Sequence, residues 1–291
     1  MKCLKCVRII LPLNFHPNFH WIAFVLASRQ NFIRCSHSYR VQNSRQREIM
    51  WQVVHSSSYI IFVHMNLSIV IPVYNEVENI GEILKRVQST RLAKEIIVVD
   101  DGSKDGTRDV LQKLDGKRKV RVILHEQNQG KGAAVVTGLR AAKGDVLLIQ
   151  DADLEYDPRD YATLLQPIEE GLADVVYGSR FLGAPHRVTM FWHMIANKLL
   201  TLMTNILYNT ILTDMETGYK VFRREVIDGM NIRAKRFDFE PEFTAKVLKR
   251  NHRIFEVPIS FNPRDYSQGK KIKLRDAFEA VWTLLRYRFL D

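Results

Sequence analysis

Apolar and polar residues follow two alternating periods along the chain from residue 67 onward. Short runs of consecutive apolar residues are typical of buried strands, and apolar residues three or four positions apart are typical of helices. The expected strands lie at 67–73, 95–99, 120–124, 145–150 and 174–177. The helices expected between them lie at 76–90, 105–114, 130–142 and 159–170. This alternation, at the spacing of βαβ units, predicts an α/β fold with a mostly parallel, doubly wound sheet.

Acidic and polar residues directly follow three of these predicted strands. They are Tyr74, Asn75 and Glu76 after the first strand, Asp100 and Asp101 after the second, and Asp151 and Asp153 after the fourth. Ligands of open α/β sheets bind in the crevice beyond the carboxyl ends of the strands. We therefore expect the three groups to share one binding site.

Asp151 and Asp153 are the strongest candidates for metal ligands. In an extended segment, residues two positions apart point the same way, so the two carboxylates would repel each other unless a cation lay between them. Carboxylate oxygens suit Mg²⁺ or Mn²⁺, which also bind phosphate oxygens. Two plainer interpretations stay open: a solvated acidic turn at 151–153, and an Asx turn at 100–103 that caps the following helix.

The segment Gly-Lys-Gly-Ala-Ala-Val at 130–135 opens a predicted helix. It lacks the G-x-x-x-x-G-K-[ST] pattern of phosphate-binding P-loops, and Val135 stands where the dinucleotide-binding pattern requires Gly or Ala. Glycines at a helix start, with Lys131 beside them, could still hold an anion, because the first amides of a helix point outward.

Several segments together resemble a known family. LSIVIPVYNE, IIVVDDGSKDGT, NQGKGAA, LLIQDADLEYDP, YGSRF and DMETGYKVF occur in the order seen in family 2 glycosyltransferases of the GT-A fold. FEPEFTAKVLKR, EVPISF and GKKIKLRDAFEAVWTLLRYR look like the branch that makes polyprenyl-phosphate sugars, typified by dolichol-phosphate mannose synthases. The resemblance covers residues 66–290. It implies inverting, metal-dependent transfer of a hexose from a GDP-mannose or UDP-glucose type of donor to dolichyl or undecaprenyl phosphate.

The resemblance implies which residues meet the nucleotide. Those expected to bind it are Pro72, Tyr74, Glu76, Asp101 and Lys131. Among them Asp101 would contact the base, and Lys131 is included for the reason given above. A late segment that carries Arg264 and Lys271 would close over the phosphates.

The resemblance also implies a catalytic set. Its members are Asp151, Asp153, Arg180 and Lys271. Asp151 and Asp153 would hold Mg²⁺ or Mn²⁺ together with the diphosphate, and Arg180 would face phosphate. Glu155 stands where many relatives carry Gln, so its extra charge would either strengthen metal binding or point away. Positive charge at this place stabilises the charge that grows on the leaving oxygen.

The acceptor decides whether a general base is required. A lipid monophosphate is largely dianionic at neutral pH and can attack without a base, whereas a sugar hydroxyl needs a positioned carboxylate. Asp214, Glu240 and Glu242 are the acids available for that task, although Glu240-Pro241-Glu242 also has the composition of a plain helix start. Two alternatives therefore stay open: transfer to a saccharide hydroxyl in envelope polysaccharide synthesis, and a non-catalytic nucleotide-binding module.

Two amphipathic helices are expected near the carboxyl end, at 188–212 and 274–289, and no apolar run after residue 65 is long enough to span a bilayer. Lys and Arg residues surround the second helix, so both helices could lie in a membrane interface, or else pack on the sheet. With three cysteines and no disulfide framework, we expect a cytoplasmic protein that is peripheral on the cytoplasmic membrane face.

Residues 1–64 differ in composition from the rest of the chain. They contain all three cysteines, eight Lys and Arg residues and a single acid, Glu48. We expect an atypical N-terminal extension, either a poorly ordered tail or a start-site overextension, followed by one GT-A domain over 65–291. The net charge of +11 is concentrated in the extension, and no recognition motif accompanies it, so we expect no nucleic-acid partner.

Overall fold

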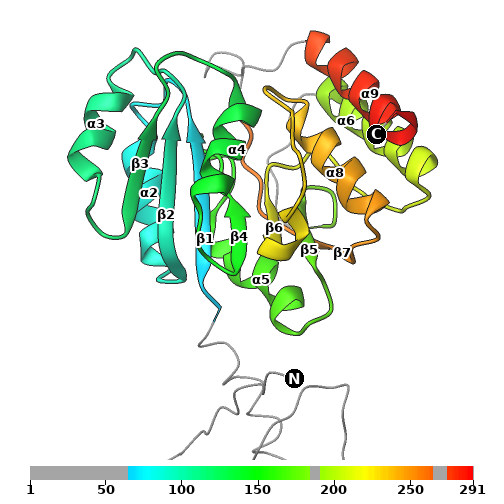
Figure 1. Ribbon diagram of the computed structural model, residues 1–291, viewed down its shortest axis with the longest axis horizontal. Helices are drawn as coiled ribbons and strands as arrows, with labels where there is room; N and C mark the ends of the chain where they lie inside the picture. The colour runs from blue at the N-terminus through cyan, green and yellow to red at the C-terminus, as the bar shows by residue number, and fades with distance from the viewer. Residues whose placement is uncertain (1–64, 184–190, 265–273, 291) are drawn as a thin grey trace, which may run out of the picture. The chain divides into compact units, whose positions relative to one another are not determined.

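The computed structural model of the chain describes residues 65–183, 191–264 and 274–290 (Figure 1). All of them belong to one of the two units into which the chain divides, His55–Asp291. The predicted N-terminal extension, 1–64, lies outside the described residues, and so does Lys271.

Seven strands form one mixed sheet in the order β3-β2-β1-β4-β6-β5-β7 (Figure 1). Their bounds are β1 Leu67–Val73, β2 Ala93–Asp100, β3 Val120–Leu124, β4 Val146–Ile149, β5 Val175–Ser179, β6 Lys220–Arg223 and β7 Ile254–Pro258. Neighbouring strands pair in parallel except where β6 pairs with β4 and β5. The predicted α/β class with a mostly parallel sheet is therefore confirmed.

Helices cover both faces of the sheet. They are α2 Ile80–Ser89, α3 Thr107–Leu114, α4 Lys131–Ala141, α5 Tyr161–Glu169, α6 Phe191–Tyr208, α7 Arg224–Ile227, α8 Phe239–Lys249 and α9 Leu274–Phe289, with a 3₁₀ turn, η2 Pro158–Asp160, before α5. One apolar cluster joins the sheet to α2 and α5, and a second joins its other face to α4 and α8. The apolar residues of α2, α4 and α5, which the sequence predicts as helices, thus hold these helices to the sheet. Helix α8 was not predicted from apolar spacing.

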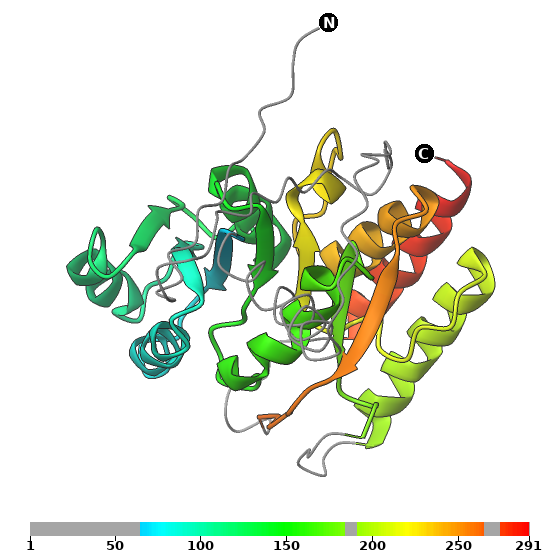
Figure 2. The same ribbon diagram turned by 90° about the horizontal axis from the view of Figure 1, so that it is seen from below.

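Helices α6 and α9 run side by side next to α8 (Figures 1 and 2). The Tyr208 hydroxyl of α6 donates a hydrogen bond of 2.8 Å to the Leu284 carbonyl of α9. Within the described ranges, no helix combines the length and the apolar composition that crossing a membrane requires.

Helix α2, the first helix that the sequence predicts, begins at Ile80 rather than at residue 76. The Glu76 carbonyl accepts hydrogen bonds from the Asn79 and Ile80 amides, and the Glu76 amide donates to the Thr107 hydroxyl at 2.9 Å. These bonds form a turn instead of a first helical turn. The turn fixes Glu76 at the carboxyl end of β1.

Candidate active site

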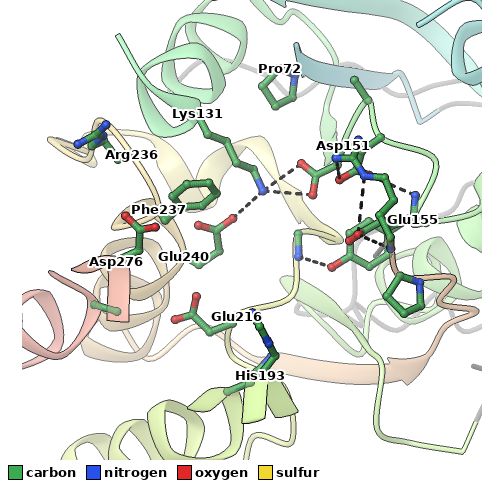
Figure 3. A pocket seen from close by; sticks show the side chains of 18 of the residues that line it. Pro72, Lys131, Asp151, Glu155, His193, Glu216, Arg236, Phe237, Glu240 and Asp276 are labelled. Carbon is green, nitrogen blue, oxygen red and sulfur yellow. Dashed lines mark hydrogen bonds and ion pairs between the residues drawn. The ribbon is translucent and has the colours of Figure 1, made fainter. Parts of the chain in front are cut away.

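A cavity of about 660 Å³ lies at the carboxyl ends of β1, β2 and β4, and α4, α6, α8 and α9 complete its wall (Figure 3). This volume suits a small-molecule ligand. The sequence-predicted residues that line it are Pro72, Tyr74, Glu76, Asp101, Lys131, Asp151, Asp153, Glu155 and Arg180. Members of all three groups of polar residues therefore line one cavity, although Asn75 and Asp100 do not.

Arg264 joins three acids of the cavity. Its guanidinium lies 3.1 Å from Glu76 Oε2 and 3.2 Å from Asp153 Oδ2, and its backbone amide donates to Glu155 Oε1 at 2.9 Å. Burial, together with the charges of Asp151 and Glu155, raises the pKa of Asp153 to about 7. The carboxylates thus lie close enough to repel one another, as the i, i+2 spacing predicted.

Lys131 forms an ionic bridge on the other side of Asp151. Its Nζ lies 3.0 Å from Asp151 Oδ1 and 3.1 Å from Glu240 Oε1 (Figure 3). Burial opposes the charge of this ammonium group, but Asp151 and Glu240 outweigh burial and raise the pKa of Lys131 well above its usual value. Lys131 is therefore a permanent cation between two parts of the cavity.

The glycines at the start of α4 serve packing rather than anion binding. The Gly132 and Ala133 amides donate to the Arg236 and Lys235 carbonyls at 3.1 and 3.0 Å. A Cβ on Gly132 would lie only 2.8 Å from the Arg236 carbonyl oxygen. The Gly130, Gly132 and Ala133 amides thus already have acceptors within the protein, and the contacts of Lys131 with the acids of the cavity are made by its side chain.

Asp101 organises the loop that precedes α4. Its Oδ1 lies 2.8 Å from His125 Nδ1 and accepts the Gln129 amide at 2.9 Å, while its Oδ2 accepts the Gly130 amide at 2.8 Å. The residue is only 2% exposed. Both carboxylate oxygens are thus engaged within the protein, and contact with a base remains a prediction.

Arg180 is held by a buried carboxylate. Its guanidinium forms two 2.7 Å hydrogen bonds with Asp214, and its backbone amide donates to the same side chain at 3.0 Å. The Asp214 side chain is fully buried. This fork-to-fork pair fixes the direction in which Arg180 faces the cavity.

A buried group of charged residues was not predicted as part of the site. Lys220, at the start of β6, is fully buried, and its Nζ donates to the Met215 carbonyl at 3.0 Å and to the Thr217 carbonyl. Burial lowers the pKa of Lys220 to about 8, although the charges of Glu240 and Glu216 oppose this. Burial and the charge of Glu240 raise the pKa of Glu216 to about 8. Both residues stand in DMETGYKVF, a segment noted only for its resemblance.

The carboxylates of Asp151 and Asp153 are the groups that would bind a divalent cation. Among the residues that the structure describes, no three His, Cys, Asp or Glu side chains form a ready metal centre. A Mg²⁺ or Mn²⁺ ion in a nucleotide site, however, needs only one or two carboxylates, because waters and phosphate oxygens complete its shell. Asp151 and Asp153 fit that arrangement, and the crowding that raises the pKa of Asp153 is what a cation would relieve.

Comparison with known proteins identifies the family. The profile of Glycosyl transferase family 2 matches residues 68–230. The chain is 32% identical over 227 residues to the dolichol-phosphate mannosyltransferase of Pyrococcus furiosus, and the matched segment covers 76% of this chain and 63% of that protein. It is also 32% identical over 213 residues to the polyprenol monophosphomannose synthase of Mycolicibacterium smegmatis, with 69% of this chain and 79% of that protein covered. The chain thus spans less than two thirds of the Pyrococcus protein.

Solved structures agree on the fold. Glucosyl-3-phosphoglycerate synthase from Mycobacterium tuberculosis, in complex with Mn²⁺, uridine-diphosphate and phosphoglyceric acid, superposes with a TM-score of 0.63 at 20% sequence identity. The match covers 81% of this chain and 83% of the other. At this identity the likeness concerns the fold alone. On these matches, the chain belongs to glycosyl transferase family 2 and has a GT-A-like fold.

Proposed function

We propose that this protein transfers a hexose from a nucleotide sugar to a polyprenyl phosphate, with inversion and with the help of a divalent cation. The observation that carries the proposal is the double character of the cavity. The carboxylates of Asp151 and Asp153 line one part of it, and another part is lined by apolar side chains of α6 and α9, namely Met194, Ala196, Leu200, Ala277 and Ala280. A charged donor and a lipid acceptor would meet in such a cavity.

The relatives support this choice of substrates by their names. Two are a dolichol-phosphate mannosyltransferase and a polyprenol monophosphomannose synthase, and a third is a dolichyl-phosphate N-acetylglucosaminyltransferase from Methanococcus voltae that uses UDP-N-acetylglucosamine. Because the sugars in these names differ, GDP-mannose and UDP-glucose both remain candidate donors here.

In the proposed reaction the donor diphosphate lies against Asp151 and Asp153. A Mg²⁺ or Mn²⁺ ion held there would supply positive charge to the leaving oxygen. Arg180 would face the phosphates, and Lys271 would add a second cation. Glu155, whose Oε1 accepts the Arg264 amide, would hold the segment after β7 beside the metal ligands. Pro72, Tyr74 and Glu76 would line the nucleoside.

The acceptor phosphate would attack the anomeric carbon directly. The new bond joins a phosphate oxygen to that carbon as the bond to the donor diphosphate breaks, and the nucleoside diphosphate leaves with its electron pair. No proton needs to be removed. Asp214 is bound to Arg180, and Glu242 accepts the Arg233 and Ala234 amides and the Lys246 ammonium group, so neither is placed as a base.

The exposed helices would bring the protein to the lipid. Large apolar side chains that are more than half exposed lie on α6 at Phe191, Trp192, Leu199, Leu202 and Ile206, and on α9 at Phe278, Trp282 and Phe289. Arg275, Arg286 and Arg288 flank the second set. This combination suits an interface with anionic lipid at the cytoplasmic face of a membrane. No nucleic acid has a part in the proposed reaction.

A panel of radiolabelled nucleotide sugars, incubated with a short polyprenyl phosphate and Mn²⁺ or Mg²⁺, tests the proposal. Label should move from the aqueous phase into the organic extract for one donor, and the product should have inverted anomeric configuration. Label that moves instead to an added saccharide, with none in the extract, would favour the alternative acceptor. Tight nucleotide binding with no transfer to any acceptor would favour the non-catalytic module.

A further inference from the structure

Two carboxylates of the cavity have acceptor oxygens that are left over. Glu240 Oε1 is bound to Lys131, but Glu240 Oε2 is buried and has no hydrogen-bond partner among the described residues. Glu216 Oε1 is likewise buried without a partner in the described part of the chain. Both residues line the cavity, and Glu240 is only 4% exposed.

Leaving such oxygens without a donor is unfavourable. A buried polar group without a partner loses its hydrogen bonds to water and gains none in return, and the loss is larger for a charged group. The remaining acceptors of the neighbouring acids are used: Asp214 binds Arg180, and Glu242 binds Lys246 and two backbone amides. Asp100 and Glu169 also have a buried oxygen without a partner among the described residues, but of these four acids Glu216 and Glu240 are the two that line the cavity.

The position of Lys131 divides the cavity into two parts. Its ammonium group lies between Asp151 on one side and Glu240 on the other, and Glu216 lies on the Glu240 side (Figure 3). The buried Lys220 ammonium group acts electrostatically on both Glu216 and Glu240 and offsets part of their charge. Glu216 and Glu240 can thus lie close to each other on the side of Lys131 that is opposite Asp151.

The chemistry of this second part selects one portion of a nucleotide sugar. A diphosphate is anionic and has no hydrogen to donate, so carboxylates repel it. A hexose is neutral and offers several hydroxyl donors. Carboxylate oxygens with free lone pairs are suitable acceptors for neighbouring hydroxyls.

We propose that Glu216 and Glu240 form the hexose subsite of the cavity, each accepting a hydrogen bond from a sugar hydroxyl with the oxygen that the protein leaves unpartnered. Lys131 then marks the boundary between the sugar and the diphosphate. This subsite rests on the proposed function, because it requires a nucleotide-sugar donor whose diphosphate lies at Asp151.

The test compares binding of a nucleoside diphosphate with binding of the corresponding nucleotide sugar. Calorimetry on the full chain with Mn²⁺ would use UDP, GDP, UDP-glucose and GDP-mannose as probes. Glu216→Gln and Glu240→Gln should each weaken binding of the nucleotide sugar by up to about ten-fold, the loss expected for one hydrogen bond. Binding of the nucleoside diphosphate should stay within about two-fold of wild type, since it makes no such bond.

Glu225→Gln is the matched control, since Glu225 is exposed on α7 and does not line the cavity. It should leave both affinities unchanged. Thermal unfolding of Glu216→Gln should occur at or above the wild-type temperature, because the change replaces a buried carboxyl group, whose Oε1 has no partner in the described part of the chain, with an amide that carries no charge at any pH. A purely structural role for Glu216 would lower that temperature.

Three results would overturn the subsite. Equal losses for the nucleoside diphosphate and the nucleotide sugar, or no loss for either, would show that the sugar does not contact these acids. Abolished turnover in Glu240→Gln with unchanged affinities would make Glu240 a general base for a hydroxyl acceptor. If wild-type protein binds none of the four probes, the proposed function itself fails, and that outcome is distinct from the first two.

Discussion

Along its strand order the sheet has two sides: the first holds β1, β2 and β4, and the second holds β6 together with the neighbouring helices α6, α8 and α9. The two sides differ in what they bury and what they expose. In β1, β2 and β4 the buried residues are apolar apart from Ser68 and Asp100. On the other side, β6 buries Lys220, α8 buries Glu240 and Glu242, and α6 and α9 leave large apolar side chains exposed. The first side follows the ordinary rule of buried apolar strands with polar groups at their ends, and the second side departs from it twice.

This difference indicates where the substrates should bind to the protein. Buried charges and exposed apolar faces are both unfavourable for a folded chain unless a ligand or a surface covers them. We interpret the first side as the support for the nucleotide, and the second side as the part that meets the sugar and the lipid. Changes on the two sides should therefore have different consequences.

The largest effect is expected from the metal ligands on the first side. Replacing both Asp151 and Asp153 with Asn should lower turnover by about a thousand-fold, or ~4 kcal/mol, because charge on the leaving oxygen loses its stabilisation. Unfolding in urea should be little changed, since Lys131 and Arg264 keep their second partners, Glu240 and Glu76, and the substitution also relieves repulsion between the two carboxylates. A double variant that keeps more than a tenth of wild-type turnover would contradict this role.

The next effect concerns the buried ion pair on the second side. Asp214→Asn should destabilise the fold by about 3 kcal/mol, because it leaves the Arg180 guanidinium buried without its counterion. The exposed pair of Asp174 and Arg253 is the matched comparison, with 55% of the Arg253 side chain accessible. Asp174→Asn should cost much less, because solvent screens this exposed pair. Equal losses in urea unfolding would mean that burial does not distinguish the two pairs.

A smaller effect is expected at the apolar face. Changing both Phe278 and Trp282 to Ser should weaken binding to anionic vesicles about ten-fold or more, given roughly 1.5–3 kcal/mol for burying a large apolar side chain. The unfolding midpoint should stay the same, because both side chains are exposed in the protein. Leu172→Ser, at an exposed position after α5, should leave vesicle binding intact. Unaltered binding by the double variant would exclude this face as the lipid contact.

The smallest effect is a change in pH dependence. The pKa of Glu216 is raised in the folded protein to about 8, so between its ordinary pKa of 4.5 and about 8 the folded state holds a proton that the unfolded state has lost. The contribution of Glu216 to stability is therefore full below pH 4.5 and is lost as the pH rises toward 8. Glu240, Lys220, Arg180 and Asp214 act on this group.

Glu216→Gln should remove this dependence of the unfolding free energy on pH. The difference in unfolding free energy between pH 5 and pH 8 should be smaller in the variant than in wild type, as measured by urea unfolding at the two pH values. An identical difference in both proteins would indicate that Glu216 titrates normally.

Sequence reasoning succeeded best where local pattern determines structure. The bounds of β1, β3 and α9 agree with the predicted ranges 67–73, 120–124 and 274–289. The strands β6 and β7 were not predicted. β6 has four residues and begins with a buried lysine, and β7 is an edge strand with no fully buried residue, so neither has the apolar run by which a strand is recognised.

The candidate site could also be predicted from the sequence only where local pattern determines structure. Motifs at the ends of strands identified several of the residues that line the cavity, but not Glu216 and not the bonds between these residues. Arg264 is 188 positions from Glu76, and only the fold brings the two side chains together. The bridge from Lys131 to Glu240 and the group around Lys220 likewise depend on tertiary packing, because each joins segments that have no shared local pattern.

The most direct test of the account is turnover during removal of divalent cations. Wild-type protein would be assayed for lipid-extractable product with its nucleotide-sugar donor and polyprenyl phosphate, with increasing chelator, and then with Mn²⁺ or Mg²⁺ restored. The account predicts that product formation falls to the level of the Asp151 and Asp153 double variant and recovers with either metal. Undiminished turnover in excess chelator would contradict it.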